Sequence, residues 1–231
     1  MAIRPVFIPA PNGQLGVVEK MLDFKWVAGM AVTQKQKSIR ELHQTASTVG
    51  ISPVLEISSK SESELGQKLS AFNLTFTTKK HKQTYTVESA FQGSKVFENG
   101  GPFIDLMTAK PKDAKRDIRL KEAGNLVGFN FLGKSFPPEP KTFFYDWLYI
   151  NALCQNSELA DQVCDFSGFT DIEFNPKKSI NCQGYAAALY LSLKTNNRLS
   201  QALASPSEFL RITREQYKNQ LRATPIQNKM F

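Results

Sequence analysis

Two side chains suited to acid–base and nucleophilic chemistry lie seven positions apart in the middle of the chain. They are Glu88 and Lys95, with Gln92 between them. If residues 87–97 form one helix, the spacing of i, i+4 and i+7 places all three on the same face. Glu88 could then act as a general acid or base, and burial beside Phe91 would raise its pKa. Lys95 could pair with this carboxylate or, as a neutral amine, act as a nucleophile.

A second candidate segment is the aromatic run around Asp146 and Trp147, in a helix predicted to begin after Thr142. Asp146 could orient Lys95 or a water molecule. Trp147 and Tyr145 offer ring faces on which a purine could stack. The alternative is that Trp147 belongs to the core and Asp146 stabilises the first helical turn through the helix dipole.

Further residues near these segments could bind a ribose or a pyrophosphate. The side-chain amides of Gln92 and Asn73 are suitable hydrogen-bond donors. Gly100 and Gly101 would let backbone N–H groups approach a phosphate, although such a pair more often forms a turn.

The segment 110–121 holds six cations and two anions, in a chain whose net charge is +8. Both features suit a polyanionic partner but do not require one. A solvated surface helix would have the same composition. The residues predicted to contact nucleic-acid phosphates are Lys112, Lys115, Arg116 and Arg119.

Metal and disulfide chemistry have little support in the sequence. The two histidines, His43 and His81, lie far apart, and the three cysteines lack the spacing of a zinc site. We expect free thiols, as in a reducing compartment, and neither a metal ion nor another cofactor. The sequence has no segment typical of a signal peptide or a membrane helix, so we expect a cytoplasmic protein without a membrane partner.

The pattern of apolar residues predicts an α+β fold, mainly helical with a small sheet. Strands are predicted at residues 5–8, 23–28, 54–57 and 171–174, and helices at 33–50, 62–69, 143–153, 184–193 and from 206 onward. We expect an N-terminal α/β extension over residues 1–65, packed on a main catalytic domain over residues 66–231.

Three segments, in order, resemble the NADAR family. Residues 69–73, Leu-Ser-Ala-Phe-Asn, are similar to its Leu-Ser-Asn-Phe motif. Residues 87–95 are similar to its Glu-His-x-(Phe/Tyr)-Gln-x-x-Lys motif, and Asp146 with Trp147 to its Asp-Trp helix. The resemblance spans about residues 65–200 and implies a NADAR-type domain. It implies catalytic roles for Glu88, Lys95, Asp146 and Trp147, and substrate binding by Ser70, Asn73, Phe91, Gln92 and Tyr145.

The chain departs from the family's pattern at three places. Ser89 stands where the family has His, and Ala71 where it has Asn. A later Asp-x-x-Trp-Gly segment is expected near residues 176–182, where Asp, Trp and Gly are absent. The third acidic residue of the site therefore cannot be assigned from the sequence.

The first 65 residues, with Gln-Lys-Gln-Lys-Ser-Ile at 34–39 and Leu-Glu-Ile-Ser at 55–58, are similar to the NADAR branch associated with DarT-type toxins. Those toxins attach ADP-ribose to guanine in DNA. The resemblance implies a glycohydrolase that removes ADP-ribose from guanine in nucleic acid, with DNA the expected substrate. It would act as an antitoxin or anti-defence factor, functionally paired with a DarT-type toxin, and release ADP-ribose. Glu88 would be the acid/base, and Lys95 either a Schiff-base nucleophile or an ion-pair partner.

Two other functions fit the same residues. One is an N-glycosidase acting on riboflavin-pathway intermediates, an activity also found in the family. The other is a non-catalytic module that binds ADP-ribosylated nucleic acid. The choice of DNA or RNA, of single or double strands, the oligomeric state and a host or phage origin are all left open by the sequence.

Overall fold

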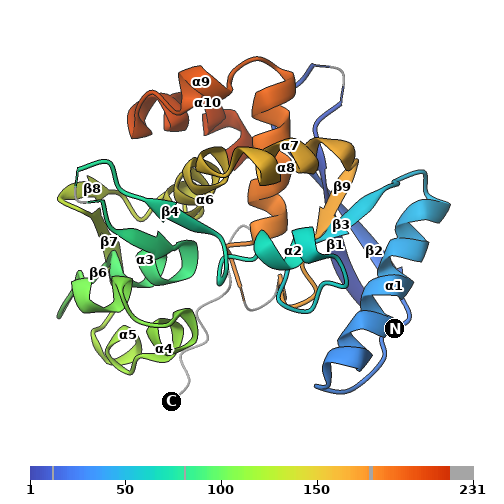
Figure 1. Cartoon of the computed structure of the whole chain (residues 1–231), viewed down its shortest axis with the longest axis horizontal. Coiled ribbons are helices and arrows are strands. Elements are labelled where there is room, and N and C mark those ends of the chain that lie inside the picture. The colour runs from blue at the N-terminus through green and yellow to red at the C-terminus, as the bar shows by residue number, and fades with distance from the viewer. Residues whose placement is uncertain (12, 81, 177–178, 219–231) are drawn as a thin grey trace.

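A computed structural model describes residues 1–11, 13–80, 82–176 and 179–218. His81 and Lys177–Lys178, part of the segment expected to hold the third acidic residue, lie outside the described residues. The fold is α+β, as predicted, but its strands form three separate sheets instead of one. In Figure 1 a four-stranded sheet and a three-stranded sheet lie on opposite sides of the helices α6 and α8.

The four-stranded sheet has the order β2-β1-β9-β3. Its strands are β1 (Ala2–Pro9), β2 (Val17–Phe24), β3 (Val54–Glu56) and β9 (Gly168–Thr170). Successive side chains of a strand point to opposite faces. Val6 therefore packs towards α1 (Val32–Thr48), whereas Phe7 contacts the ring of Tyr185 on α8. Each face of the sheet is covered by a helix.

This sheet combines segments that are far apart in the sequence. β9 lies between β1, to which it is antiparallel, and β3, to which it is parallel. Glu56 on β3 is directly opposite Thr170 on β9. The first 65 residues therefore share a sheet with residues 168–170. The predicted domain boundary at residue 65 would assign the strands of this one sheet to two domains.

Two helices form the centre of the molecule. They are α6 (Phe143–Gln155) and α8 (Gln183–Thr195). Residues 184–193 of α8 are all buried, as their small apolar side chains predict. On α6, the buried hydroxyl of Tyr149 donates to the carbonyl of Leu69 at 2.8 Å. This bond ties the segment before α3 to the helical centre.

A strand–helix–strand unit stands beside this centre. Strand β5 (Thr84–Thr86) continues directly into α3 (Val87–Gly93), and Thr86 caps the helix by accepting from the Ser89 amide. β6 (Lys95–Phe97) then pairs with the middle strand of a second sheet, β7 (Leu126–Phe131). The whole of α3 is buried, so its side chains are held firmly.

The remaining elements complete the surface. The strands are β4 (Thr75–Thr77), paired with β5, and β8 (Lys134–Phe136), paired with β7. The helices are α2 (Glu64–Lys68), η1 (Ile104–Met107), α4 (Pro111–Arg116), α5 (Arg119–Glu122), α7 (Ser157–Gln162), η2 (Val163–Asp165), α9 (Leu199–Ala202) and α10 (Pro206–Lys218). None of the helices in the described part of the chain has the length and apolarity that crossing a membrane requires.

The prediction of one helix over residues 87–97 is wrong. The helix ends at Gly93, and Lys95 is the first residue of β6, where it is opposite Phe129. Gly93 packs tightly against Met107, since a Cβ added to Gly93 would lie 2.5 Å from Cγ of Met107. Lys95 therefore reaches its position through sheet pairing with β7, and helical spacing does not place it beside Glu88.

Other element boundaries also differ from the predictions. The second strand covers residues 17–24 instead of 23–28, and residues 171–174 form a turn after β9. The N-cap of α1 is Ala31, and the side chain of Gln34 accepts from its backbone amide at 3.1 Å. The helices that begin at residues 143 and 206 start as predicted.

Candidate active site

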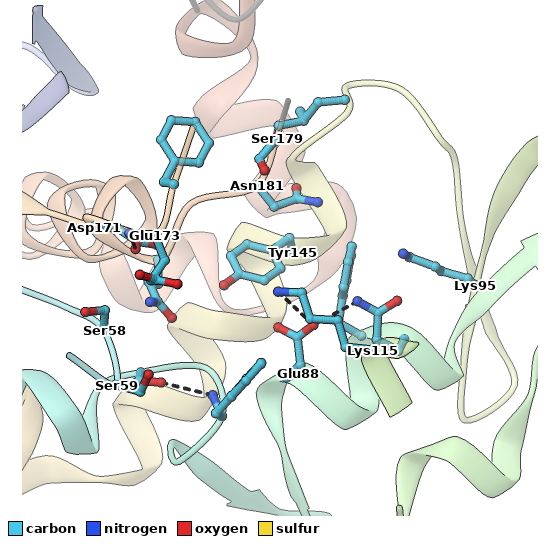
Figure 2. Close-up of a pocket in the computed structure, with 17 residues that line it drawn as sticks. Ser58, Ser59, Glu88, Lys95, Lys115, Tyr145, Asp171, Glu173, Ser179 and Asn181 are labelled. Atoms are coloured by element: carbon cyan, nitrogen blue, oxygen red, sulfur yellow. Dashed lines mark hydrogen bonds and ion pairs between the residues drawn. The ribbon is translucent and has the colours of Figure 1, made fainter. Parts of the chain in front are cut away.

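A cleft of about 330 Å³ opens between α3, α6 and the turn that follows β9. That volume is enough for a nucleotide-sized ligand. It is lined by Ser58, Ser59, Ser70, Phe72, Glu88, Phe91, Gln92, Lys95, Lys115, Tyr145, Asp171, Glu173, Phe174, Ser179, Ile180, Asn181 and Gln183. In Figure 2 the carboxylates of Asp171 and Glu173 lie on one side of Tyr145, and Lys115 and Lys95 on the other. Two acidic side chains and two lysines therefore lie on different sides of the cleft.

Glu88 lies in the first turn of α3, at the floor of this cleft. Its backbone amide donates to the carbonyl of Ala71 at 2.9 Å, and the residue as a whole is only 5% exposed. One carboxylate oxygen, Oε1, accepts a hydrogen bond of 2.8 Å from Nε2 of Gln92. The amide oxygen of Gln92 is buried in the same cleft and accepts no hydrogen bond from a described residue. A ligand N–H or O–H group would satisfy it.

Lys95 reaches the cleft from strand β6. Its Nζ lies 4.9 Å from the centre of the Phe91 ring. The pKa of Lys95 is lowered to about 8, mainly by burial; Glu88 opposes this shift, and the neighbouring charge of Lys115 adds to it. An amine with this pKa is partly neutral near physiological pH, which is what nucleophilic attack by a lysine requires.

Lys115 contributes a second positive charge, from the exposed side of α4. Its Nζ lies 3.6 Å from Oε1 of Glu88 and 5.2 Å from the centre of the Phe72 ring. Of the four basic residues predicted to contact phosphates, it is the one that lines the cleft. Phe72 was not selected from the sequence, although it lies within the motif at residues 69–73. Its half-buried ring is a surface on which a base could stack.

Asp171 and Glu173 form the acidic wall, and sequence reasoning missed both. Burial and the nearby Glu56 carboxylate raise the pKa of Asp171 well above its ordinary range. The third acidic residue was sought near residues 176–182, but the structure places two carboxylates in the turn just before that segment. The signal that could have found them is an Asp-x-Glu pair immediately after a strand.

Several predicted site residues lie outside the cleft, among them Trp147, Asp146 and Asn73. Trp147 packs against Phe136 and Phe144 in the core, with ring centres 5.0 and 6.5 Å apart, and does not wall the cleft. Asp146 is completely buried on the same helix, where one oxygen, Oδ2, accepts from the hydroxyl of Tyr217 at 3.3 Å. These positions favour the alternative prediction, in which both residues have structural roles. Asn73 is exposed and donates to a neighbouring backbone carbonyl.

The two consecutive glycines form a turn and do not cradle a phosphate in this cleft. Gly100 pairs with Phe97 in an isolated bridge. Gly101 has φ +87°, and a Cβ at this position would lie 2.3 Å from the carbonyl oxygen of Lys95. Only glycine fits such a left-handed position so close to another backbone. Their role is to hold β6, and thus Lys95, in place.

The other predicted phosphate contacts divide into two groups. Lys112 and Arg116 are exposed on α4, and neither forms an ion pair with a described residue. Arg119 instead pairs with Asp105 at 2.6 Å and with Asp117 at 2.8 Å, so its charge is already matched. The replacement of the family's His by Ser89 also lies away from the cleft, because its hydroxyl donates to a backbone carbonyl behind α3.

The cleft combines carboxylic acids, a partly neutral amine and a fixed cation. Such a set can protonate a leaving group, activate water and attack an electron-poor carbon. Within the described part of the chain, no group of three or more His, Cys, Asp or Glu side chains is arranged to hold a metal ion.

Comparison with known proteins identifies the family. A sequence model described as "DarT1-associated NADAR antitoxin" matches residues 2–223. A search of curated proteins finds no match. Because the family match extends over nearly the whole chain, this protein belongs to the DarT1-associated NADAR antitoxins.

Proposed function

We propose that the protein hydrolyses the N-glycosidic bond between ADP-ribose and a guanine base of nucleic acid, and so reverses the modification made by a DarT-type toxin. Its membership in an antitoxin family supports the biological role. The chemistry is supported by one observation above all: Glu88, Lys95 and Asp171 line a single cleft. Breaking a bond to an anomeric carbon requires a proton for the departing base and a group that accommodates the electron-poor sugar.

The raised pKa of Asp171 makes this residue the proton donor in the proposal. As the bond between the sugar carbon C1′ and guanine breaks, Asp171 protonates the departing base. Lys95, in its neutral form, forms a bond from Nζ to C1′, and Glu88 accepts the proton that the amine loses. The sugar ring opens as its oxygen leaves C1′ and takes up the proton held by Glu88, which produces a protonated imine between Lys95 and the sugar.

Water then completes the reaction. It adds to the imine carbon, the bond from C1′ to Nζ breaks, and ADP-ribose leaves as an aldehyde that closes to its ring form. Lys95 is regenerated as a free amine, so the sequence consumes one water molecule in total. In a second route, Lys95 stays charged and binds phosphate, while Glu88 activates water for direct attack on C1′.

A polymer substrate is supported by the charges beside the cleft. Lys112 and Arg116 are exposed on the same helix as Lys115, which itself lines the cleft. A free nucleotide held within about 330 Å³ would not reach them, whereas the phosphates of a nucleic acid strand that flank the modified base would.

The decisive experiment measures ADP-ribose released from guanine-ADP-ribosylated DNA by chromatography. Wild-type protein should release it, and Glu88→Gln and Lys95→Arg should each lower kcat by about 100-fold or more. Matched changes at exposed positions, Glu158→Gln and Lys20→Arg, should have no effect. Tight binding without release would overturn the hydrolase proposal and support a reader module.

Borohydride reduction separates the two routes. During turnover it should trap a covalent adduct of ADP-ribose on wild-type protein, detected by intact mass, and Lys95→Arg should abolish that adduct. Continued turnover without any trapped adduct would exclude the imine and leave direct attack by water.

A further inference from the structure

We infer that Glu56 is a positioning residue that ties together the backbone on both sides of Asp171 and thereby directs the Asp171 carboxyl group into the cleft. Glu56 does not line the cleft itself. It is the last residue of β3 and is 2% exposed, so its side chain is committed to interactions inside the protein. The importance of Asp171 in this inference rests on the proposed function.

The two carboxylate oxygens of Glu56 bind residues on either side of Asp171. Oε2 accepts a hydrogen bond of 2.7 Å from the hydroxyl of Thr170, and Oε1 accepts one of 2.8 Å from the backbone amide of Ile172. The amide of Ile57 also donates to the carbonyl of Thr170 at 2.8 Å. The turn that presents Asp171 is thus held by side-chain and main-chain bonds from one strand.

The network continues away from the cleft to helix α1. Nε2 of His43 lies 2.8 Å from the hydroxyl oxygen of Thr170. Because that hydroxyl donates its one proton to Glu56, His43 must be the donor in this pair. Burial lowers the pKa of His43 to about 4, so the ring is neutral at physiological pH. Three residues from three elements therefore act together behind Asp171.

The charges around Glu56 explain why a carboxylate at this position matters beyond geometry. The groups that face it are the carboxyl groups of Asp171 and Glu173, the hydroxyl of Ser58, and the neutral His43 through Thr170. Two buried carboxyl groups that are close to each other do not both ionise readily. Burial raises the pKa of both groups, and the hydrogen bonds that Glu56 accepts from Thr170 and Ile172 favour its charged form. Glu56 therefore favours the protonated form of Asp171, the form that the proposed reaction requires.

The test compares Glu56→Ala with Glu56→Gln, and uses Glu62→Gln as the control. Alanine removes both hydrogen bonds, so kcat on guanine-ADP-ribosylated DNA should fall by about 100-fold while KM changes by about twofold or less. Glutamine keeps an acceptor for Ile172 and a polar partner for Thr170, so kcat should stay within about fivefold of wild type. Glu62 is exposed and pairs with Arg40, and its variant should behave as wild type.

A pH profile adds a readout that loss of stability alone would not move. In Glu56→Gln, the alkaline limb of the kcat/KM profile should shift to lower pH by about one unit. The reason is that the pKa of Asp171 falls when the negative charge next to it is removed. If Glu56→Ala fails to fold, Thr170→Val removes one arm of the bridge at nearly constant volume. That variant should lower kcat by about tenfold with KM unchanged.

Hydrogen–deuterium exchange tests the positioning role without relying on catalysis. Exchange in the segment 168–174 should increase in Glu56→Ala and remain low in Glu56→Gln. If the segment loosens while even wild-type protein releases no ADP-ribose, the proposed function is wrong and the positioning role stands. If wild type is active and Glu56→Ala neither loosens the segment nor lowers kcat, the inference is overturned.

Discussion

At the level of single residues, the chemistry available in the cleft depends on the surroundings of each ionisable side chain more than on its residue type. Lys95 and Lys115 are both lysines that face Glu88, yet they differ in burial. Lys115 is 56% exposed, whereas burial against Phe91 holds the pKa of Lys95 at about 8. One lysine is therefore a fixed cation, and the other can supply a neutral amine.

The pKa of Lys95 leads to a prediction that is independent of turnover. Folding lowers this pKa, so the neutral fraction rises about tenfold per pH unit up to pH 8 and then levels off. Pulse labelling with an amine-reactive reagent, read by peptide mass spectrometry, should give a labelling midpoint near pH 8 for Lys95. Exposed Lys20 on β2 serves as the comparison. Labelling of Lys95 that keeps rising beyond pH 9 would contradict the prediction.

The aromatic residues of the site lead to a second prediction at this scale. Phe72 faces the cleft, whereas Trp147 packs in the core. Phe72→Ala should raise KM for modified DNA by about tenfold or more, because a stacked base is worth about 1–3 kcal/mol. Trp147→Phe should leave KM unchanged and lower the free energy of unfolding, measured by urea denaturation. The reverse pattern would return Trp147 to the binding site.

At the level of secondary-structure elements, α4 connects the cleft to the surrounding surface. Ala114 is buried and anchors this short helix, while Lys112, Lys115 and Arg116 remain exposed. Arg119, in the following helix, is held by two aspartates. The same charge-rich segment thus contains both a cationic surface and a structural ion-pair cluster.

The exposed cations of α4 lead to a prediction about polymer substrates. Lys112→Glu with Arg116→Glu should weaken activity on DNA by about tenfold or more, with little effect on a modified mononucleotide, and the salt dependence should become shallower. Charge reversal of Lys20 on the distant strand β2 is the control (Figure 1). Equal losses on polymer and mononucleotide would exclude a role of α4 in contacting the strand.

At the level of the whole molecule, the N-terminal segment and the residues that line the cleft belong to one packed structure. Three of the four strands in the larger sheet come from the first 65 residues, and the fourth ends just before Asp171. The core supports the same view, since Phe7 on β1 contacts the rings of Phe174 and Tyr185.

A fragment of residues 66–231 should therefore not fold as a stable unit. It would leave β9 without either neighbour and expose Phe169, which is fully buried in the intact chain. Circular dichroism with thermal melting should show no cooperative transition for the fragment, in contrast to the full chain. A cooperative melt would support two independent domains divided at residue 65.

Features that depend on local patterns could be predicted from the amino-acid sequence. The continuous small and apolar side chains of residues 184–193 predict the buried helix α8. Ser205 and Pro206 predict the start of α10, where the Ser205 hydroxyl accepts from the Glu208 amide at 3.1 Å. The motif at residues 87–95 also identified Glu88, Gln92 and Lys95, all of which line the cleft.

How these residues come together depends on contacts between distant segments of the folded chain. Lys95 lies on a strand because residues 126–131, far along the chain, offer hydrogen-bond partners that a helix would forgo. Asp171 enters the cleft because Glu56, more than one hundred positions earlier, holds the turn around it. Helical periodicity is a local property, whereas strand pairing and buried side-chain bridges join segments whose proximity no local pattern encodes.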